Sequence, residues 1–114
     1  MFFGKDVRVL LKRDANKSFK LLNKKNDKVS ISLVNSIKRN IEILKNNPQF
    51  GEPMGKKRIP KKFKKMGINN LYRIELPNYW RMIYTIEGTR VEIFLFVLRI
   101  FDHKDYNKLF GYNS

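Results

Sequence analysis

The feature that most constrains the fold is the alternation of apolar and polar side chains in residues 71–86, which fits two antiparallel strands joined by a short turn. A three-residue turn at residues 77–79 pairs Leu76 with Trp80 and continues the apolar face from Ile74 into the second strand. A two-residue turn would mix the faces, and a shift of one residue would flip every side chain. The sequence therefore predicts one buried face and one open face for this hairpin.

The predicted open face is polar, because by this register it carries three charged residues, Arg73, Glu75 and Arg81. A third strand over residues 90–100 follows a predicted two-residue turn at Glu87 and Gly88. That turn puts the odd-numbered residues of the third strand on the buried face. It also puts Phe94 and Phe96 on the open face near Arg81.

Two helices are predicted before this meander. Residues 6–13 alternate and form a first strand, and Asp14 is a suitable N-cap for a helix over residues 15–25. A second helix covers residues 29–46, where one apolar stripe recurs at helical spacing through Ile31, Val34, Ile37, Ile41 and Leu44. We expect these two helices to cover the buried face of the sheet.

The remaining segments are short. Residues 48–69 show no clear period, so we expect a functional loop, a disordered loop or a short element hidden in it. Asp102 can cap a last short helix. The predicted fold class is α+β: a small antiparallel sheet of about four strands, two N-terminal helices packed on one face and a short C-terminal helix. Residues 1–114 form one domain.

The charge of the chain implies a polyanionic partner. The net charge is +15, and residues 51–66 hold seven basic side chains against one acidic one. The chain has no cysteine, so disulfide and thiolate chemistry are excluded. No apolar run approaches the roughly 20 residues of a membrane helix. We therefore expect a cytoplasmic protein that does not enter membranes and binds nucleic acid, with RNA as the simplest partner.

Two segments resemble a known family. Residues 71–86, with the sequence LYRIELPNYWRMIYTI, resemble the central signature of the RelE/ParE toxin superfamily: an aromatic-basic-apolar strand, a turn, and an Arg followed by an apolar-Tyr strand. Residues 100–106, IFDHKDY, are similar to the basic, Tyr-containing C-terminal piece of that family. The basic loop and Arg81 make the chain more similar to the RNA-cleaving RelE branch than to the gyrase-directed ParE branch.

The resemblance implies the toxin of a toxin–antitoxin pair, which cuts messenger RNA on the ribosome and is silenced by a cognate acidic antitoxin. The reaction implied is attack of a ribose 2′-oxygen on the adjacent phosphate, without metal or cofactor. This chemistry needs a base for the 2′-hydroxyl, cations around the phosphorane oxygens and an acid for the leaving oxygen.

The resemblance and the residue types together give five candidate catalytic residues. Arg81 matches the Arg of the family's middle strand and can grip two phosphate oxygens at once, with Arg73 on the same face. Glu75 departs from the Lys of some relatives; it is either a general base or an ion-pair partner that holds Arg81. His103 is the only histidine, and its ordinary pKa suits proton transfer. Tyr106, or Tyr112, could donate the last proton or stack on a base; packing of the last helix is the alternative.

The predicted RNA-binding residues position a backbone and do not read sequence. They are Lys56, Lys57, Arg58, Lys61, Lys62, Lys64, Lys65 and Lys104. Two other functions stay open. One is a gyrase poison of the same fold, and the other is a catalytically silent module that binds RNA or the ribosome.

Overall fold

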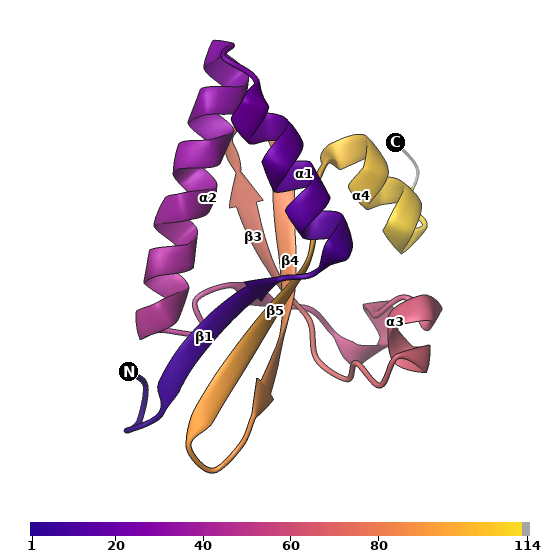
Figure 1. The fold of residues 1–114 in the computed structure, drawn as a ribbon. Coiled ribbons are helices and arrows are strands. Elements are labelled where there is room, and N and C mark those ends of the chain that lie inside the picture. Colours follow the sequence, from indigo (N-terminus) through magenta and orange to yellow (C-terminus); the bar gives the residue numbers. More distant parts are fainter. Residues whose placement is uncertain (113–114) are drawn as a thin grey trace.

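The structure of the protein is a computed structural model that describes residues 1–112. Two helices lie against one face of a sheet, and shorter elements lie against its other face (Figure 1). In chain order the elements are β1 (Asp6–Leu11), α1 (Arg13–Lys24), α2 (Lys28–Asn46), β2 (Glu52–Pro53), the 3-10 helix η1 (Lys56–Arg58), α3 (Lys61–Lys65), β3 (Tyr72–Leu76), the 3-10 helix η2 (Pro77–Tyr79), β4 (Trp80–Gly88), β5 (Glu92–Asp102) and α4 (His103–Phe110).

The sheet has five strands in the order β1-β5-β4-β3-β2. The α+β class, the two N-terminal helices and the short C-terminal helix are confirmed. The prediction of about four antiparallel strands was incomplete, because β2 adds a short edge strand and β1 pairs with β5 in parallel. The parallel pairing follows from the connection, since the chain crosses over through α1 and α2 and returns to the sheet from the other edge.

The predicted register of the first hairpin is confirmed. Leu76 pairs with Trp80, Glu75 pairs with Arg81, and the turn between them is the 3-10 helix η2. Asn78 and Tyr79 have φ angles of 59° and 62°, so two non-glycine residues in succession adopt the left-handed conformation. For Tyr79 this conformation is strained, and it is held by the hairpin around it.

The predicted register of the second hairpin was wrong. Four residues, 89–92, separate the pair Gly88 and Ile93, where a two-residue turn was expected. The Thr89 hydroxyl accepts backbone hydrogen bonds inside this loop, which stabilises the longer connection. As a result Phe96 lies opposite Thr85, and it is Phe101 that lies beside Arg81.

The two long helices bury the first core against one sheet face. Its members include Ala15, Leu33, Ile37, Leu44, Met82, Tyr84, Leu95 and Val97. The expected N-cap at Asp14 was wrong, since α1 begins at Arg13 and Asp14 lies in its first turn, where a negative charge favours the helix dipole. In α2 the buried stripe includes Leu33, whereas Ile31 is exposed. Asp27 caps α2 by accepting a hydrogen bond from the Ser30 N–H, and this bond lowers the pKa of its carboxyl.

The other sheet face is not open, so that prediction was wrong. A second core covers much of it, formed by Met54, Ile59, Phe63, Ile68, Leu71, Ile83, Leu98, Phe101 and Tyr106. The segment 48–69 is thus neither structureless nor disordered, because it contains β2, η1 and α3. Its apolar side chains Ile59 and Phe63 are buried. Burial of their large apolar surface is favourable and anchors the segment on the sheet.

A buried tyrosine fastens the start of this segment to β4. The Tyr84 hydroxyl donates a hydrogen bond of 2.7 Å to the Pro48 carbonyl and accepts one of 2.9 Å from the Gly51 N–H. Burial raises the pKa of Tyr84 to about 12. Gly51 fits closely, because a Cβ there would lie 2.8 Å from the Tyr84 ring and hydroxyl.

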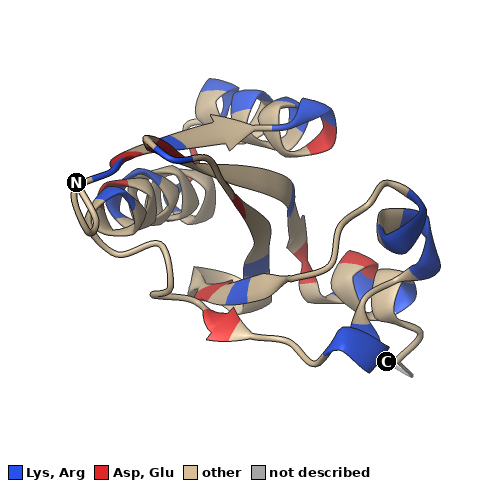
Figure 2. Cartoon of the chain, turned by 90° about the horizontal axis from the view of Figure 1, so that it is seen from below, with Lys and Arg blue, Asp and Glu red and all other residues tan. Residues whose placement is uncertain are grey.

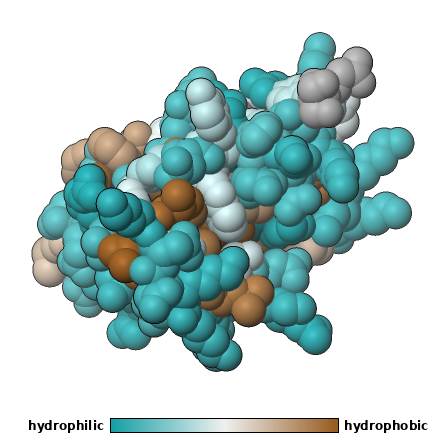
Figure 3. All heavy atoms as spheres, turned by 90° about the horizontal axis from the view of Figure 1, so that it is seen from above, coloured by the Kyte–Doolittle hydropathy of each residue, from teal (hydrophilic) through white to brown (hydrophobic). Residues whose placement is uncertain are grey.

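The surface at the end of the molecule where α1 and α2 meet is mainly hydrophilic, with hydrophobic residues showing only in small patches (Figure 3). Within residues 1–112, none of the helices combines the length and the apolar character needed to cross a bilayer.

Candidate functional site

Three arginines on adjacent strands form the central feature of the second sheet face. We call Arg73 on β3, Arg81 on β4 and Arg99 on β5 the arginine cluster. Arg73 and Arg99 both pair with Ile83, one from each side, so their Cα atoms are about 10 Å apart. Arg81 precedes Ile83 by two residues on the same middle strand. Side chains of this length can therefore meet over a single bound group.

Arg99 was missed by the sequence reading, although the sequence held a signal for it. The predicted turn assigned odd-numbered residues of the third strand to the buried face, which would place the Arg99 guanidinium in the core. A β-bulge resolves this conflict: Ile83 pairs with Arg99 but Tyr84 pairs with Val97, so one extra residue shifts the register. The arginine at an expected core position thus indicated that the strand carries a bulge.

Tyr106 of α4 lies between the arginines. Its hydroxyl accepts a hydrogen bond of 3.0 Å from Arg73 Nη1, and the Arg81 guanidinium carbon lies 4.8 Å from its ring centroid. The Arg99 guanidinium carbon lies 4.9 Å from the ring of Phe101, which meets Tyr106 edge-on. Tyr106 is only 2% exposed. It is therefore better placed to orient Arg73 and hold α4 than to reach a leaving oxygen.

The arginine cluster is short of hydrogen-bond acceptors. The Nε atoms of Arg73, Arg81 and Arg99 are all buried, and within residues 1–112 none of them has a partner. Among the described residues, one carboxylate pairs with the cluster. Glu52 lies 2.8 Å from Arg73, and this ion pair raises the pKa of Arg73 and lowers that of Glu52. A buried donor without an acceptor costs about 1–3 kcal/mol. These Nε atoms are out of reach of solvent, so a bound anion with several oxygens would relieve this cost only if the side chains turned toward it.

The expected ion pair between Glu75 and Arg81 is not formed, although the two residues are cross-strand neighbours. Arg81 Nη1 instead donates a hydrogen bond of 3.1 Å to the Tyr79 carbonyl. Glu75 is exposed and makes no ion pair within the described part of the chain. Its carboxylate is therefore free to contact a ligand at this end of the sheet.

His103 lies at the same end. It is the first residue of α4, and its ring meets that of Tyr79 edge-on with 5.8 Å between centroids. Tyr79 thus contacts His103 through its ring and Arg81 through its carbonyl. A hollow of about 420 Å³ lies along the turn, between Glu75 and Arg81. Tyr79, which sequence reasoning placed only in a turn, is 75% exposed and offers a surface for stacking on a base.

The basic segment, by which we mean residues 56–65, lies beside the arginine cluster. Its Lys and Arg residues gather on η1 and α3 (Figure 2), and all seven are exposed. The Arg58 guanidinium carbon lies 5.2 Å from the ring of Tyr112, which in turn packs on Tyr106. Lys104, the other predicted RNA-binding residue, is exposed on α4. Ile59 and Phe63 are almost fully buried, so they hold this segment on the sheet, and its exposed cations are the groups that can contact an RNA backbone.

The structure thus brings four candidate catalytic residues to one end of the second sheet face: Arg73, Glu75, Arg81 and His103. The fifth, Tyr106, lies beneath them, and the basic segment lies alongside. Such an arrangement can hold a phosphodiester by bidentate contacts and stabilise added negative charge on it. Residues 1–112 contain no group of three or more side chains suited to holding a metal ion.

Comparison with known proteins adds no relative to this description. A scan against protein-family models, a search of curated proteins and a search of solved structures each gave no match to the chain. The resemblance to the RelE/ParE superfamily therefore stays a prediction that rests on the residues themselves.

Proposed function

We propose that the chain is a cytoplasmic, metal-independent endoribonuclease that cleaves messenger RNA on the ribosome, and that a cognate acidic antitoxin silences it. The observation that carries the proposal is the arginine cluster, with three buried Nε donors that lack acceptors in the described residues. A phosphodiester supplies such acceptors. The net charge of +15 favours a nucleic-acid substrate and an acidic protein partner.

The cleavage step needs no group beyond the RNA and the chain. The 2′-oxygen forms a bond to phosphorus while the bond from phosphorus to the 5′-oxygen breaks, leaving a cyclic phosphate and a 5′-hydroxyl. The 2′ proton passes to a base, and an acid gives a proton to the 5′-oxygen. Arg81, with Arg73 and Arg99, would hold the phosphorane oxygens.

Two groups near Arg81 could move these protons. The His103 imidazole can act as base or acid, and the exposed Glu75 carboxylate can act as base. Tyr79 would stack on a neighbouring base, and Tyr106 would keep Arg73 in place. The basic segment and Lys104 would contact backbone phosphates of messenger or ribosomal RNA.

The test is cleavage of messenger RNA on purified ribosomes, read by mapping the 5′ ends of the products. We expect the wild type to cut and Arg81→Ala to cut about 10²- to 10³-fold more slowly, as for the loss of one donor to transition-state charge. Arg90→Ala is the matched control, because it removes the same charge from the exposed 89–92 loop. Equal cutting by Arg81→Ala and wild type would refute the proposal.

A silent RNA-binding module is the second candidate, and one observation favours it. Arg73 and Arg81 both contact Tyr106, so the arginines already serve to hold α4 on the sheet. In that case the wild type and His103→Ala would bind RNA with the same salt dependence, and neither would give a cut product.

A further inference from the structure

A second hollow, lined by none of the three arginines of the cluster, lies among the residues that connect β2 to β3. It has a volume of about 480 Å³ and is lined by Lys56, Lys57, Ile59, Lys64, Ile68 and Asn69, with Gly67 at its edge. Its size falls within the range of small-molecule sites. The proposed cleavage step does not use the hollow itself, although its three lysines belong to the basic segment proposed to contact RNA phosphates.

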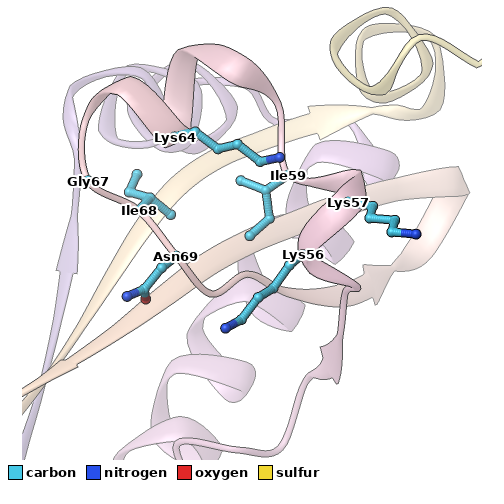
Figure 4. Close-up of a pocket in the computed structure, with 7 residues that line it drawn as sticks. All are labelled: Lys56, Lys57, Ile59, Lys64, Gly67, Ile68 and Asn69. Atoms are coloured by element: carbon cyan, nitrogen blue, oxygen red, sulfur yellow. The ribbon is translucent and has the colours of Figure 1, made fainter.

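The floor of this hollow is apolar. Ile59 and Ile68 come from the two sides of the segment and face each other across the hollow (Figure 4). Both are buried members of the second core, so they form a fixed floor. Gly67 has a φ of 83°, and nothing lies within 4 Å of the place a Cβ would take. The backbone therefore leaves this side of the hollow unobstructed.

The rim of the hollow is cationic and polar. Lys64 extends along one edge toward Ile59, and the Lys56 amine lies at another edge on the same side as the Asn69 amide, whereas the Lys57 amine points outward (Figure 4). Within the described residues, no carboxylate lines the hollow. The Asn69 Oδ1 accepts a hydrogen bond of 3.0 Å from Asn70, which fixes the orientation of the Asn69 amide.

We propose that this hollow binds one nucleotide. A flat heterocycle would cover Ile59 and Ile68, its edge would meet the Asn69 amide, and its phosphate would bind Lys56 and Lys64. Amide side chains match the donor and acceptor pattern of base edges, and ammonium groups are suitable partners for phosphate. An inorganic anion alone would leave the exposed part of the apolar floor uncovered, and an acidic peptide would bring no flat group to cover it.

The nucleotide has two possible sources, a free mononucleotide or one unstacked base of a bound RNA strand. Either source satisfies the same chemistry. Binding of a nucleotide requires no cutting. The assignment therefore goes beyond the proposed cleavage, and an experiment can refute one without refuting the other.

The experiment follows the Ile59 and Ile68 methyl signals by NMR while AMP is added to the full chain. We expect saturable shifts of both methyls in the wild type and at least tenfold weaker binding in Lys64→Glu and in Lys56→Glu. Lys20→Glu, which makes the same charge change at an exposed position of α1, is the control and should bind AMP like the wild type. Unchanged amide spectra elsewhere would show that each variant folds.

Component probes separate the possible ligands. Inorganic phosphate that shifts the methyls as strongly as AMP at equal concentration would overturn the proposal, and so would a glutamate-rich peptide that does so. A single-stranded RNA that shifts the methyls more than AMP, and loses the effect when one base is removed, assigns the hollow to RNA. Tighter binding of AMP assigns it to a free nucleotide. No shift with either AMP or RNA refutes the site.

Discussion

The hydroxyl of Tyr84 offers a sharp test of how the site is supported. It joins Pro48 and Gly51 to β4, and Gly51 directly precedes Glu52, the partner of Arg73. Tyr84→Phe removes one donor and one acceptor from the core while keeping the ring. It leaves the Gly51 N–H and the Pro48 carbonyl buried without their partner. We expect the free energy of unfolding to fall by about 2 to 4 kcal/mol, at about 1 to 2 kcal/mol for each hydrogen bond removed.

The assay is denaturant unfolding, with Tyr72→Phe as the matched control. The Tyr72 ring stacks on that of Tyr84, with centroids 5.2 Å apart, but its hydroxyl makes no hydrogen bond within the described residues. We expect the control to change stability by less than about 0.5 kcal/mol. Equal losses of stability in the two variants would refute the argument, because stability would then depend on the rings and not on the hydroxyl.

The pH dependence gives an independent check. The folded protein raises the pKa of Tyr84 from 10.0 to about 12, which corresponds to about 3 kcal/mol. This stabilisation is fully present below pH 10, where the Tyr84 hydroxyl keeps its proton in both the folded and the unfolded state. It is lost as the pH rises through 12, because the unfolded state loses the Tyr84 proton at a lower pH than the folded state does. The stability difference between wild type and Tyr84→Phe should therefore shrink between pH 10 and 12. A constant difference across this interval would contradict the assigned cause.

Three further predictions follow from other parts of the fold. Gly51→Ala should destabilise the fold by about 1–3 kcal/mol in denaturant unfolding, because a Cβ would press on Tyr84, whereas Gly55→Ala, with open space around its Cα, should not. Asp27→Asn should lower the melting temperature at pH 7 and make the decrease of the melting temperature in acid less steep. The Asp27 carboxylate stabilises the fold above its ordinary pKa, and this stabilisation is lost as the pH drops through the lowered pKa of the folded state. Alanine at the four lysines of α3 should weaken ribosome pelleting without changing thermal unfolding, and should reduce the slope of log affinity against log salt by about one for each phosphate that is no longer bound; unchanged pelleting would refute the docking role.

The sequence predicted the parts of the fold that depend on neighbouring residues. The alternation around the 77–79 turn was enough to pair Leu76 with Trp80, because any other turn length mixes the faces. The stripe of α2 was enough to orient that helix. The second hairpin failed because its loop is closed by the Thr89 hydroxyl and its ladder carries a bulge, and neither leaves a periodic pattern.

The candidate site could be predicted only in part, for a related reason. Arg73, Arg81 and His103 were predicted from the family resemblance and from residue type. Arg99 was missed because the bulge moved it to the other face. The expected open face was wrong because the side chains that cover it, such as Phe63, come from a five-residue helix too short to show a period. Coverage by segments distant in sequence is a tertiary property that a local pattern does not report.

The parallel pairing of β1 with β5 also bears on the time at which the protein acquires its shape. β1 finds its neighbour only when residues 92–102 have left the exit tunnel. The helices α1 and α2 likewise pack on a sheet whose central strands follow them in the chain. A nascent chain therefore lacks the sheet on which β1, α1 and α2 pack until β5 has emerged. We expect stable folding of these elements only after residues 92–102 are outside the ribosome, and no shorter product to assemble the three arginines.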